Sequence, residues 1–236
     1  MSGRLYGVGV GPGDPELLTL KALRIVESVA VIAHFAKAGR RSNARAVVAG
    51  HIRPGTVELP LPYPVTTEID RQHAGYKAAI AAFFDASAAQ VAAHLDAGRD
   101  VAVLSEGDPF FYGSYLHLHV RLARRYPTEV VPGVTSMSAC WSLAGEPLVR
   151  GDEVLAVLPS TLAESRLVDR LGQGDGAVLM KLGRNLPKVR RALARAGRLD
   201  RAIYVERGTM PGSRVMRLAE KQDDEAPYFA VVLVPC

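Results

Sequence analysis

Cysteine is scarce in this chain, and the absences that accompany it exclude several classes of protein. Only Cys140 and Cys236 are present, so the sequence offers neither a disulfide framework nor the spacing of a metal site. No lipidation box surrounds Cys236, although it is the last residue. The first residues show no secretory apolar segment, and no apolar run approaches the length of a membrane span. We therefore expect a cytoplasmic protein with free thiols, no bound metal and no membrane partner.

Charge of either sign is not concentrated in long blocks. The 236 residues include 29 Lys and Arg against 24 Asp and Glu, a net charge of +5. A basic balance favours an anionic partner, or it can reflect a solvated basic surface. The basic residues are scattered and lack the interleaved aromatics that are typical of nucleic-acid-binding surfaces. Nucleic acid is therefore not an expected partner, whereas an acidic small molecule is.

Apolar runs alternate with helical patterns, which predicts an α/β fold with two domains. In residues 1–132 we expect a mostly parallel five-stranded sheet, with strands near 5–11, 28–33, 56–59, 100–104 and 128–131 and a long helix over 69–97. In residues 133–236 we expect a second α/β domain with a mixed sheet. Its strands are predicted at 154–158, 176–182, 201–205 and 228–234, and its helices at 163–171 and 186–196.

The segment 105–114 follows a buried strand and precedes a helix, so it lies where open α/β sheets bind ligands. Gly107 permits backbone torsions that other residues avoid. Pro109 fixes its own backbone and favours an extended conformation for Asp108. A carboxylate is thereby held at a stiff corner above the sheet. The alternative is a sharp turn in which Asp108 is only a turn former.

A second glycine-rich turn, at residues 11–16, follows the first predicted strand. The pattern does not fit a dinucleotide-binding oxidoreductase, because Pro12 falls where the last glycine of the fingerprint belongs. No acidic residue lies near Ala33 and His34, where such a protein holds the ribose. Gly9, Gly11 and Gly13 still indicate that the backbone closely approaches another group, because they leave no side chain in the way.

A third turn, at Pro132 and Gly133, opens a helix whose start offers free N–H groups and the hydroxyls of Thr135 and Ser136. We expect this turn near Gly107, because both follow strands of one parallel sheet.

Together these segments resemble the signatures of the tetrapyrrole (class III) methyltransferases. Residues 9–19, 105–109 and 132–136 are similar to the three family motifs, in the family's order and spacing. Three further features distinguish branches within the family: Glu106, where most relatives have glycine, and the segments 42–46 and 180–184. In these features the chain resembles the branch that methylates the C-20 meso carbon of precorrin-2 in cobalamin biosynthesis.

This resemblance implies a homodimer that binds S-adenosylmethionine in a cleft between its two α/β domains, with a tetrapyrrole as the small-molecule substrate. The cofactor contacts that it implies are Pro12, Glu106, Gly107, Asp108, Phe111, Thr135, Ser136, Leu182, Gly208 and Thr209. Methyl transfer to a carbon nucleophile depends mainly on alignment. If a base is needed, Asp108 is the first candidate and Tyr112 the second.

The substrate of such an enzyme carries carboxylate arms, which arginine pairs with in two parallel hydrogen bonds. Arg40, Arg41, Arg45 and Arg184 are the predicted partners of these arms. A solvated loop is the alternative interpretation of the first three.

Other functions remain open on the sequence. They are a nucleotide-dependent oxidoreductase, an RNA-modifying relative, a diphthine-type methyltransferase, and a family member acting on cobalt-precorrin-2 or on another precorrin position.

Overall fold

Five parallel strands form the first sheet, in the order β3-β2-β4-β1-β5. In this computed structural model, which describes residues 1–64 and 74–236, the sheet belongs to a unit spanning Met1–Thr135. Buried apolar runs with high strand propensity form its interior. The strands are β1 Leu5–Gly9, β2 Val31–Lys37, β3 Val57–Tyr63, β4 Val101–Ser105 and β5 Thr128–Val131.

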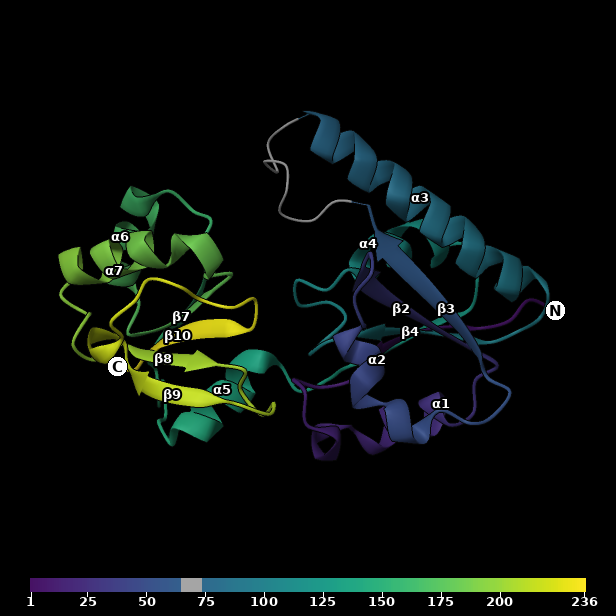
Figure 1. Cartoon of the computed structure of the whole chain (residues 1–236), viewed down its shortest axis with the longest axis horizontal. Coiled ribbons are helices and arrows are strands. Elements are labelled where there is room, and N and C mark those ends of the chain that lie inside the picture. Colours follow the sequence, from purple (N-terminus) through teal and green to yellow (C-terminus); the bar gives the residue numbers. More distant parts are fainter. Residues whose placement is uncertain (65–73) are drawn as a thin grey trace. The chain divides into compact units, whose positions relative to one another are not determined.

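Helices cover both faces of this sheet (Figure 1). Alternate residues of β4 point to opposite faces: Val101 and Val103 pack with α3 and α4, and Ala102 and Leu104 pack with α1 and α2. The predicted parallel α/β architecture of the first half is therefore confirmed. The helices are α1 Leu20–Val26, α2 Asn43–Val47, α3 Ala74–Asp96 and α4 Tyr115–Leu122, with 3₁₀ turns η1 Pro15–Leu17 and η2 Ala49–His51.

Strand β3 is longer than predicted. It continues past the predicted 56–59, because Pro60 and Pro62 lie within the strand and pair in register with His34 and Ala36 of β2. Proline is tolerated here because β3 is the edge strand, so a missing N–H facing away from β2 costs no ladder hydrogen bond.

Helix α3 begins at Ala74, and residues 69–73 of the predicted helix lie outside the described residues. Its segment Gly75–Asp96 is long and apolar enough to cross a membrane by length and composition, contrary to the expectation that no such run exists. It also packs on the sheet, since Phe84, Val91 and Leu95 belong to the buried core of the first unit. A core helix passes the same length and composition test.

The second unit, Ser136–Cys236, contains a mixed sheet in the order β6-β7-β10-β8-β9. Strands β6 and β7 are parallel, and the remaining neighbours are antiparallel. This confirms the predicted mixed sheet, whereas strand β9 was not predicted. The strands are β6 Leu155–Pro159, β7 Gly176–Met180, β8 Ile203–Glu206, β9 Arg214–Arg217 and β10 Ala230–Val234.

Helices again lie on both faces of the second sheet (Figure 1). Helices α6 and α7 bury Leu167, Leu171 and Val189 on one face, and α5 packs Cys140 and Trp141 on the other. The domain boundary that the sequence places between residues 132 and 133 remains a prediction. The helices are α5 Ser136–Ala144, α6 Glu164–Gln173 and α7 Leu186–Arg195, with 3₁₀ turns η3 Gly183–Asn185 and η4 Leu218–Glu220.

Replacing Gly7 should destabilise the first unit. A Cβ atom at this position of β1 would lie 2.4 Å from ring carbons of the fully buried Tyr115. We expect Gly7→Ala to lower the free energy of unfolding by about 1–3 kcal/mol, the typical cost of overpacking a core. Urea denaturation followed by circular dichroism measures the change. Gly50→Ala is the control, because nothing lies within 4 Å of its Cβ position; equal losses in both variants would contradict the prediction.

Candidate active site

Three turns that are far apart in the sequence meet at the carboxyl edge of the first sheet. They follow β4, β1 and β5, which are adjacent strands in the order β4-β1-β5. The main-chain N–H of Val10 donates to the carbonyl oxygen of Ser105 at 2.9 Å, and that of Gly107 donates to the carbonyl oxygen of Gly11 at 2.8 Å. The turns therefore lie close together within the first unit, as predicted.

Glycine is required where the turns touch. A Cβ on Gly133 would lie 2.1 Å from the carbonyl oxygen of Gly107, and a Cβ on Gly9 would lie 2.6 Å from the same oxygen. Contacts under 3 Å with backbone atoms cannot be relieved by a side-chain rotation. Gly107 itself has a φ of 66°, in the left-handed region that favours glycine. The turns thus pack main chain against main chain and present main-chain groups to a ligand.

Asp108 links the second turn to the third. Its Oδ1 accepts a hydrogen bond from the N–H of Phe110 at 2.8 Å, and its Oδ2 accepts one from the N–H of Gly133 at 3.2 Å. Each carboxylate oxygen therefore already has a main-chain donor. Charge-assisted bonds of this kind are stronger than those between neutral groups. The stiff corner expected from the sequence is present, and the carboxylate fixes it.

The rest of the second turn carries aromatic side chains. Tyr112 has a φ of 57° and is about half exposed at 49%, and its ring centroid lies 4.9 Å from that of Phe111. Ser114 and Tyr63 of β3 join their hydroxyls in a hydrogen bond. In the first turn, Pro12 is buried beside Gly11. The predicted contacts Pro12, Gly107, Asp108 and Phe111 therefore belong to turns that meet in one unit.

Glu106 makes a contact that sequence reasoning did not find. Burial raises the pKa of Glu106, and the neighbouring Asn43 side chain and Ala44 N–H, at the start of α2, lower it. No sequence spacing signals this pair, because its members lie on different elements.

The predicted arginines differ in their surroundings. Arg40 and Arg41 are exposed on the segment between β2 and α2. Arg45 on α2 instead donates from Nε and Nη2 to both oxygens of Glu58, at 2.8 and 2.9 Å. This pair lowers the pKa of Glu58. A substrate carboxylate would have to compete with Glu58 for Arg45.

In the second unit, the turn after β8 contains Gly208 and Thr209. A Cβ on Gly208 would lie 2.5 Å from Sγ of Cys140, which lies on the helix that begins at Ser136. Burial raises the pKa of the Cys140 thiol to about 12, so this group is a packing contact and not a nucleophile. The predicted contacts Ser136 and Gly208 therefore belong to elements that pack together.

The same turn has a buried polar atom in need of a partner. Thr209 Oγ1 has no hydrogen-bond partner within the described parts of the chain, and the same holds for Ser105 Oγ at the end of β4 in the first unit. Buried hydroxyls are normally satisfied by a protein group, an ordered water or a ligand. Leu182 is buried in the core of the second unit, and Arg184 is exposed on η3.

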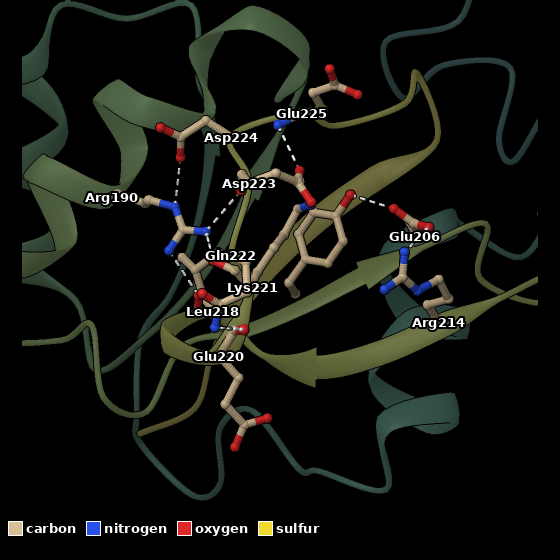
Figure 2. Close-up of polar contacts among 11 residues, drawn as sticks. Arg190, Glu206, Arg214, Leu218, Glu220, Lys221, Gln222, Asp223, Asp224 and Glu225 are labelled. Carbon is tan, nitrogen blue, oxygen red and sulfur yellow. Dashed lines mark hydrogen bonds and ion pairs between the residues drawn. The ribbon is translucent and has the colours of Figure 1, made fainter.

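A network of polar side chains surrounds the end of β8 (Figure 2). Tyr204 donates to Glu206 at 2.6 Å, and Glu206 pairs with Arg214 at 3.5 Å. The Lys221 side chain is 5% exposed; it pairs with Asp223 and lies 5.0 Å from the Tyr204 ring centroid. Lys221 is therefore buried, although it stands in a charged segment of the sequence.

Four residues other than glycine have a left-handed backbone among the residues that the structure describes. They are Tyr112, Lys181, Arg207 and Thr209, and all lie in or beside segments predicted to hold the cofactor. Such torsions cost of order 1–3 kcal/mol each and concentrate at ligand sites. No group of three or more potential metal ligands occurs in the described ranges. These features define an α/β protein with a candidate ligand site built from glycine-rich main-chain turns.

The family follows from comparison with known proteins. Residues 4–222 match the tetrapyrrole (corrin/porphyrin) methylases, and the chain belongs to this family. It is therefore a methyltransferase, as the resemblance of its three turns predicted.

Its relatives narrow the assignment. The chain is 66% identical to a precorrin-2 C(20)-methyltransferase of Sinorhizobium sp. over 99% of its own length and 95% of the relative's. It is 32% identical to a cobalt-precorrin-2 C(20)-methyltransferase of Salmonella typhimurium, with 99% and 97% covered. A uroporphyrin-III C-methyltransferase of Thermus thermophilus, crystallised with S-adenosylhomocysteine, is 27% identical with a TM-score of 0.71, covering 99% of this chain and 92% of that one.

Asparagine at position 108 should weaken the link between the second and third turns. An amide has one acceptor oxygen, so either Phe110 or Gly133 loses its hydrogen-bond partner. We expect Asp108→Asn to lower the free energy of unfolding by about 1–3 kcal/mol in urea denaturation. Asp14→Asn is the matched control, because Asp14 caps a turn through a single bond to the N–H of Glu16 and asparagine caps equally well. Full stability of Asp108→Asn together with lost methyl transfer would instead assign Asp108 to the chemistry.

Proposed function

We propose that this chain transfers the methyl group of S-adenosylmethionine to the C-20 meso carbon of precorrin-2, giving precorrin-3A, in cobalamin biosynthesis. The observation that carries the proposal is the 66% identity to the Sinorhizobium enzyme over nearly the whole of both chains. The lower identity to the Salmonella enzyme, 32%, favours the metal-free substrate over cobalt-precorrin-2.

The cofactor would be held by main-chain groups of the glycine-rich turns and by two hydroxyls. The close approach of Gly9, Gly107 and Gly133 leaves no side chain between a ligand and the backbone. The unpartnered hydroxyls of Ser105 and Thr209 add polar atoms. We propose that the cofactor contacts inferred from the family come together in a cleft between the two domains. They are Pro12, Glu106, Gly107, Asp108, Phe111, Thr135, Ser136, Leu182, Gly208 and Thr209.

S-adenosylmethionine supplies an electrophilic methyl group on a sulfonium, and the tetrapyrrole supplies the carbon nucleophile through electron donation from a pyrrole nitrogen. The protein's task is then to align the two and to exclude water. Asp108 serves this task by holding two turns together. Its role as a base stays a prediction, as does that of Tyr112, whose strained backbone places a phenol on the turn.

The substrate's carboxylate arms would pair with exposed arginines. Arg40, Arg41 and Arg184 are exposed, which suits this role. For Arg45, the pair with Glu58 supports a structural role in addition to the predicted one. The net charge of +5 is consistent with a polyanionic substrate.

The assembly and location of the enzyme are part of the same proposal. We propose a homodimer in the cytoplasm with neither nucleic acid nor membrane as partner, as in the family that the turns resemble. The scattered basic residues support the exclusion of nucleic acid.

The activity can be tested with enzymatically made precorrin-2 and cofactor carrying a ¹³C-labelled methyl group. We expect carbon NMR of the product to show one labelled methyl on C-20. Labelling at another carbon would contradict the proposal. Cobalt-precorrin-2 serves as the comparison substrate. A higher kcat/KM with cobalt-precorrin-2 than with precorrin-2 would show that the metal-bearing compound is the preferred substrate.

Cofactor class can be tested by calorimetric titration. We expect S-adenosylhomocysteine to bind and NAD not to bind, because Pro12 and the residues near His34 do not provide a dinucleotide site. Binding of NAD in preference to S-adenosylhomocysteine would support an oxidoreductase.

Removal of the two exposed arginines before α2 should affect the substrate and not the cofactor. We expect the double variant Arg40→Ala, Arg41→Ala to raise the KM for precorrin-2 by about tenfold or more, since each lost charge-assisted bond is worth roughly 1.5–3 kcal/mol. The affinity for S-adenosylhomocysteine should stay within about twofold. Arg53→Ala is the control for loss of an exposed arginine elsewhere in the first unit. An unchanged KM in the double variant would remove both residues from the site.

A further inference from the structure

Tyr63, the last residue of β3, brings a hydroxyl group to the second turn. Because β3 continues past its two prolines, its end pairs in register with Lys37, the last residue of β2. The Tyr63 hydroxyl forms a hydrogen bond with the hydroxyl of Ser114, the residue before α4. The two residues are 51 positions apart in the sequence, so this bond joins the edge strand of the sheet to the end of the turn after β4.

The Tyr63 ring is held in place by other aromatic rings. Its centroid lies 4.7 Å from that of Phe83 and 6.1 Å from that of Phe84, both on α3, and 5.6 Å from that of Phe35 on β2. Phe84 in turn stacks on His117 of α4, with 4.0 Å between the centroids. Aromatic pairs at such separations stabilise a fold beyond the area that they bury. The ring is therefore fixed among strands and helices, which gives its hydroxyl a defined position.

The Ser114 hydroxyl serves this contact and not the helix that follows it. Serine at a helix start commonly accepts a hydrogen bond from a main-chain N–H two or three residues farther on. Ser114 has helical torsions, with φ −67° and ψ −23°, and its side chain makes no capping bond. Its hydroxyl is thus used to connect the turn to β3.

The second turn is thereby held at both ends. Asp108 fixes its beginning by accepting two main-chain hydrogen bonds, and the bond from Tyr63 fixes its end at Ser114. Between these anchors the chain folds back tightly, since a Cβ on Gly113 would lie 2.6 Å from the carbonyl oxygen of Pro109.

A predicted cofactor contact, Phe111, lies between the two anchors. Its neighbour Tyr112 has a left-handed backbone with a φ of 57°. Such torsions persist only where the surrounding structure determines them strongly. Without the anchor at Ser114, the turn would be free to relax these torsions and to move the Phe111 side chain.

We propose that Tyr63 is a positioning residue for the cofactor: its hydroxyl holds Ser114, and through it the Phe111 part of the second turn, in the conformation that binds S-adenosylmethionine. The inference rests on the proposed function, because the site that the turn forms is the cofactor site named there. Tyr63 acts through Ser114 and takes no part in the methyl transfer itself.

Binding of S-adenosylhomocysteine tests this role. We expect Tyr63→Phe, which keeps the ring and removes the hydroxyl, to raise the Kd by about threefold to tenfold in calorimetric titration, the effect of losing one hydrogen bond. Ser114→Ala should raise it by a similar factor. The double variant should be no worse than either single variant, because the two residues act through one contact. Ser114→Thr keeps a hydroxyl and should recover most of the affinity.

Tyr126→Phe is the matched control. The Tyr126 hydroxyl donates to Asp96 at 2.8 Å, near the start of β5, so this variant loses a tyrosine hydrogen bond of the same unit at the opposite edge of the sheet. Its Kd should stay within about twofold of the wild-type value. An equal rise of the Kd in Tyr126→Phe and Tyr63→Phe would attribute the effect to lost stability and overturn the inference. An unchanged Kd in both Tyr63→Phe and Ser114→Ala would also overturn it.

Hydrogen–deuterium exchange on the full chain reports on the turn without cofactor. The amides of Phe111, Leu116 and His117 donate hydrogen bonds within the turn and the start of α4. Their exchange should be about threefold to tenfold faster in Tyr63→Phe and unchanged in Tyr126→Phe. Wild-type exchange rates in Tyr63→Phe would show that the hydroxyl does not hold the turn, which overturns the inference.

Steady-state kinetics separate positioning from chemistry. In Tyr63→Phe the KM for S-adenosylmethionine should rise with the Kd, and kcat at saturating cofactor should stay within about twofold with its pH profile unchanged. A tenfold fall in kcat with an altered pH profile, absent from Ser114→Ala, would make Tyr63 a proton-transfer group and overturn the inference. If the wild-type chain binds S-adenosylhomocysteine but methylates no precorrin-2, the proposed substrate fails, and the binding and exchange experiments still decide the role of Tyr63.

Discussion

The close packing of Gly9, Gly107 and Gly133 is the constraint on which the rest of the site depends. Three strands that are adjacent in one parallel sheet end at the same edge, so the turns that follow them have to share a small space. Main chain fits there and a Cβ atom does not. Once the backbones are in contact, Asp108 can reach across to Gly133.

Each unit contains its own restrained turns. The first has an edge of main-chain groups, and Tyr112 adopts a left-handed backbone in the turn after β4. The second offers the turn after β8, where Arg207 and Thr209 adopt left-handed torsions and a buried network at Lys221 and Glu206 fixes the strand end (Figure 2). Strained turns persist only when their surroundings determine them strongly, and the packing of Gly208 on Cys140 provides such a restraint.

The sequence predicted those features that leave a local signal. Apolar runs located both sheets, and glycine with proline located the three turns, because these residues act on their own backbone. It did not predict contacts between side chains of different elements, such as Arg45 with Glu58 or Tyr63 with Ser114. Strand β9 was missed because it has only four residues, two apolar residues between two arginines, with neither an apolar run nor an alternating pattern. The predicted strand 56–59 stops short of Pro60 and Pro62, because the cost of a proline depends on whether its strand is central or at the edge, which residue type does not reveal.

Those same prolines have a consequence for solubility. Strand β3 borders its sheet, and both proline nitrogens lie on its unpaired side, because a proline facing β2 would interrupt the ladder. The open border thus presents carbonyl acceptors without the matching donors at two alternate positions. A second chain that approached in extended form would find an incomplete template, so the enzyme is protected against edge-to-edge aggregation at the border of its first sheet.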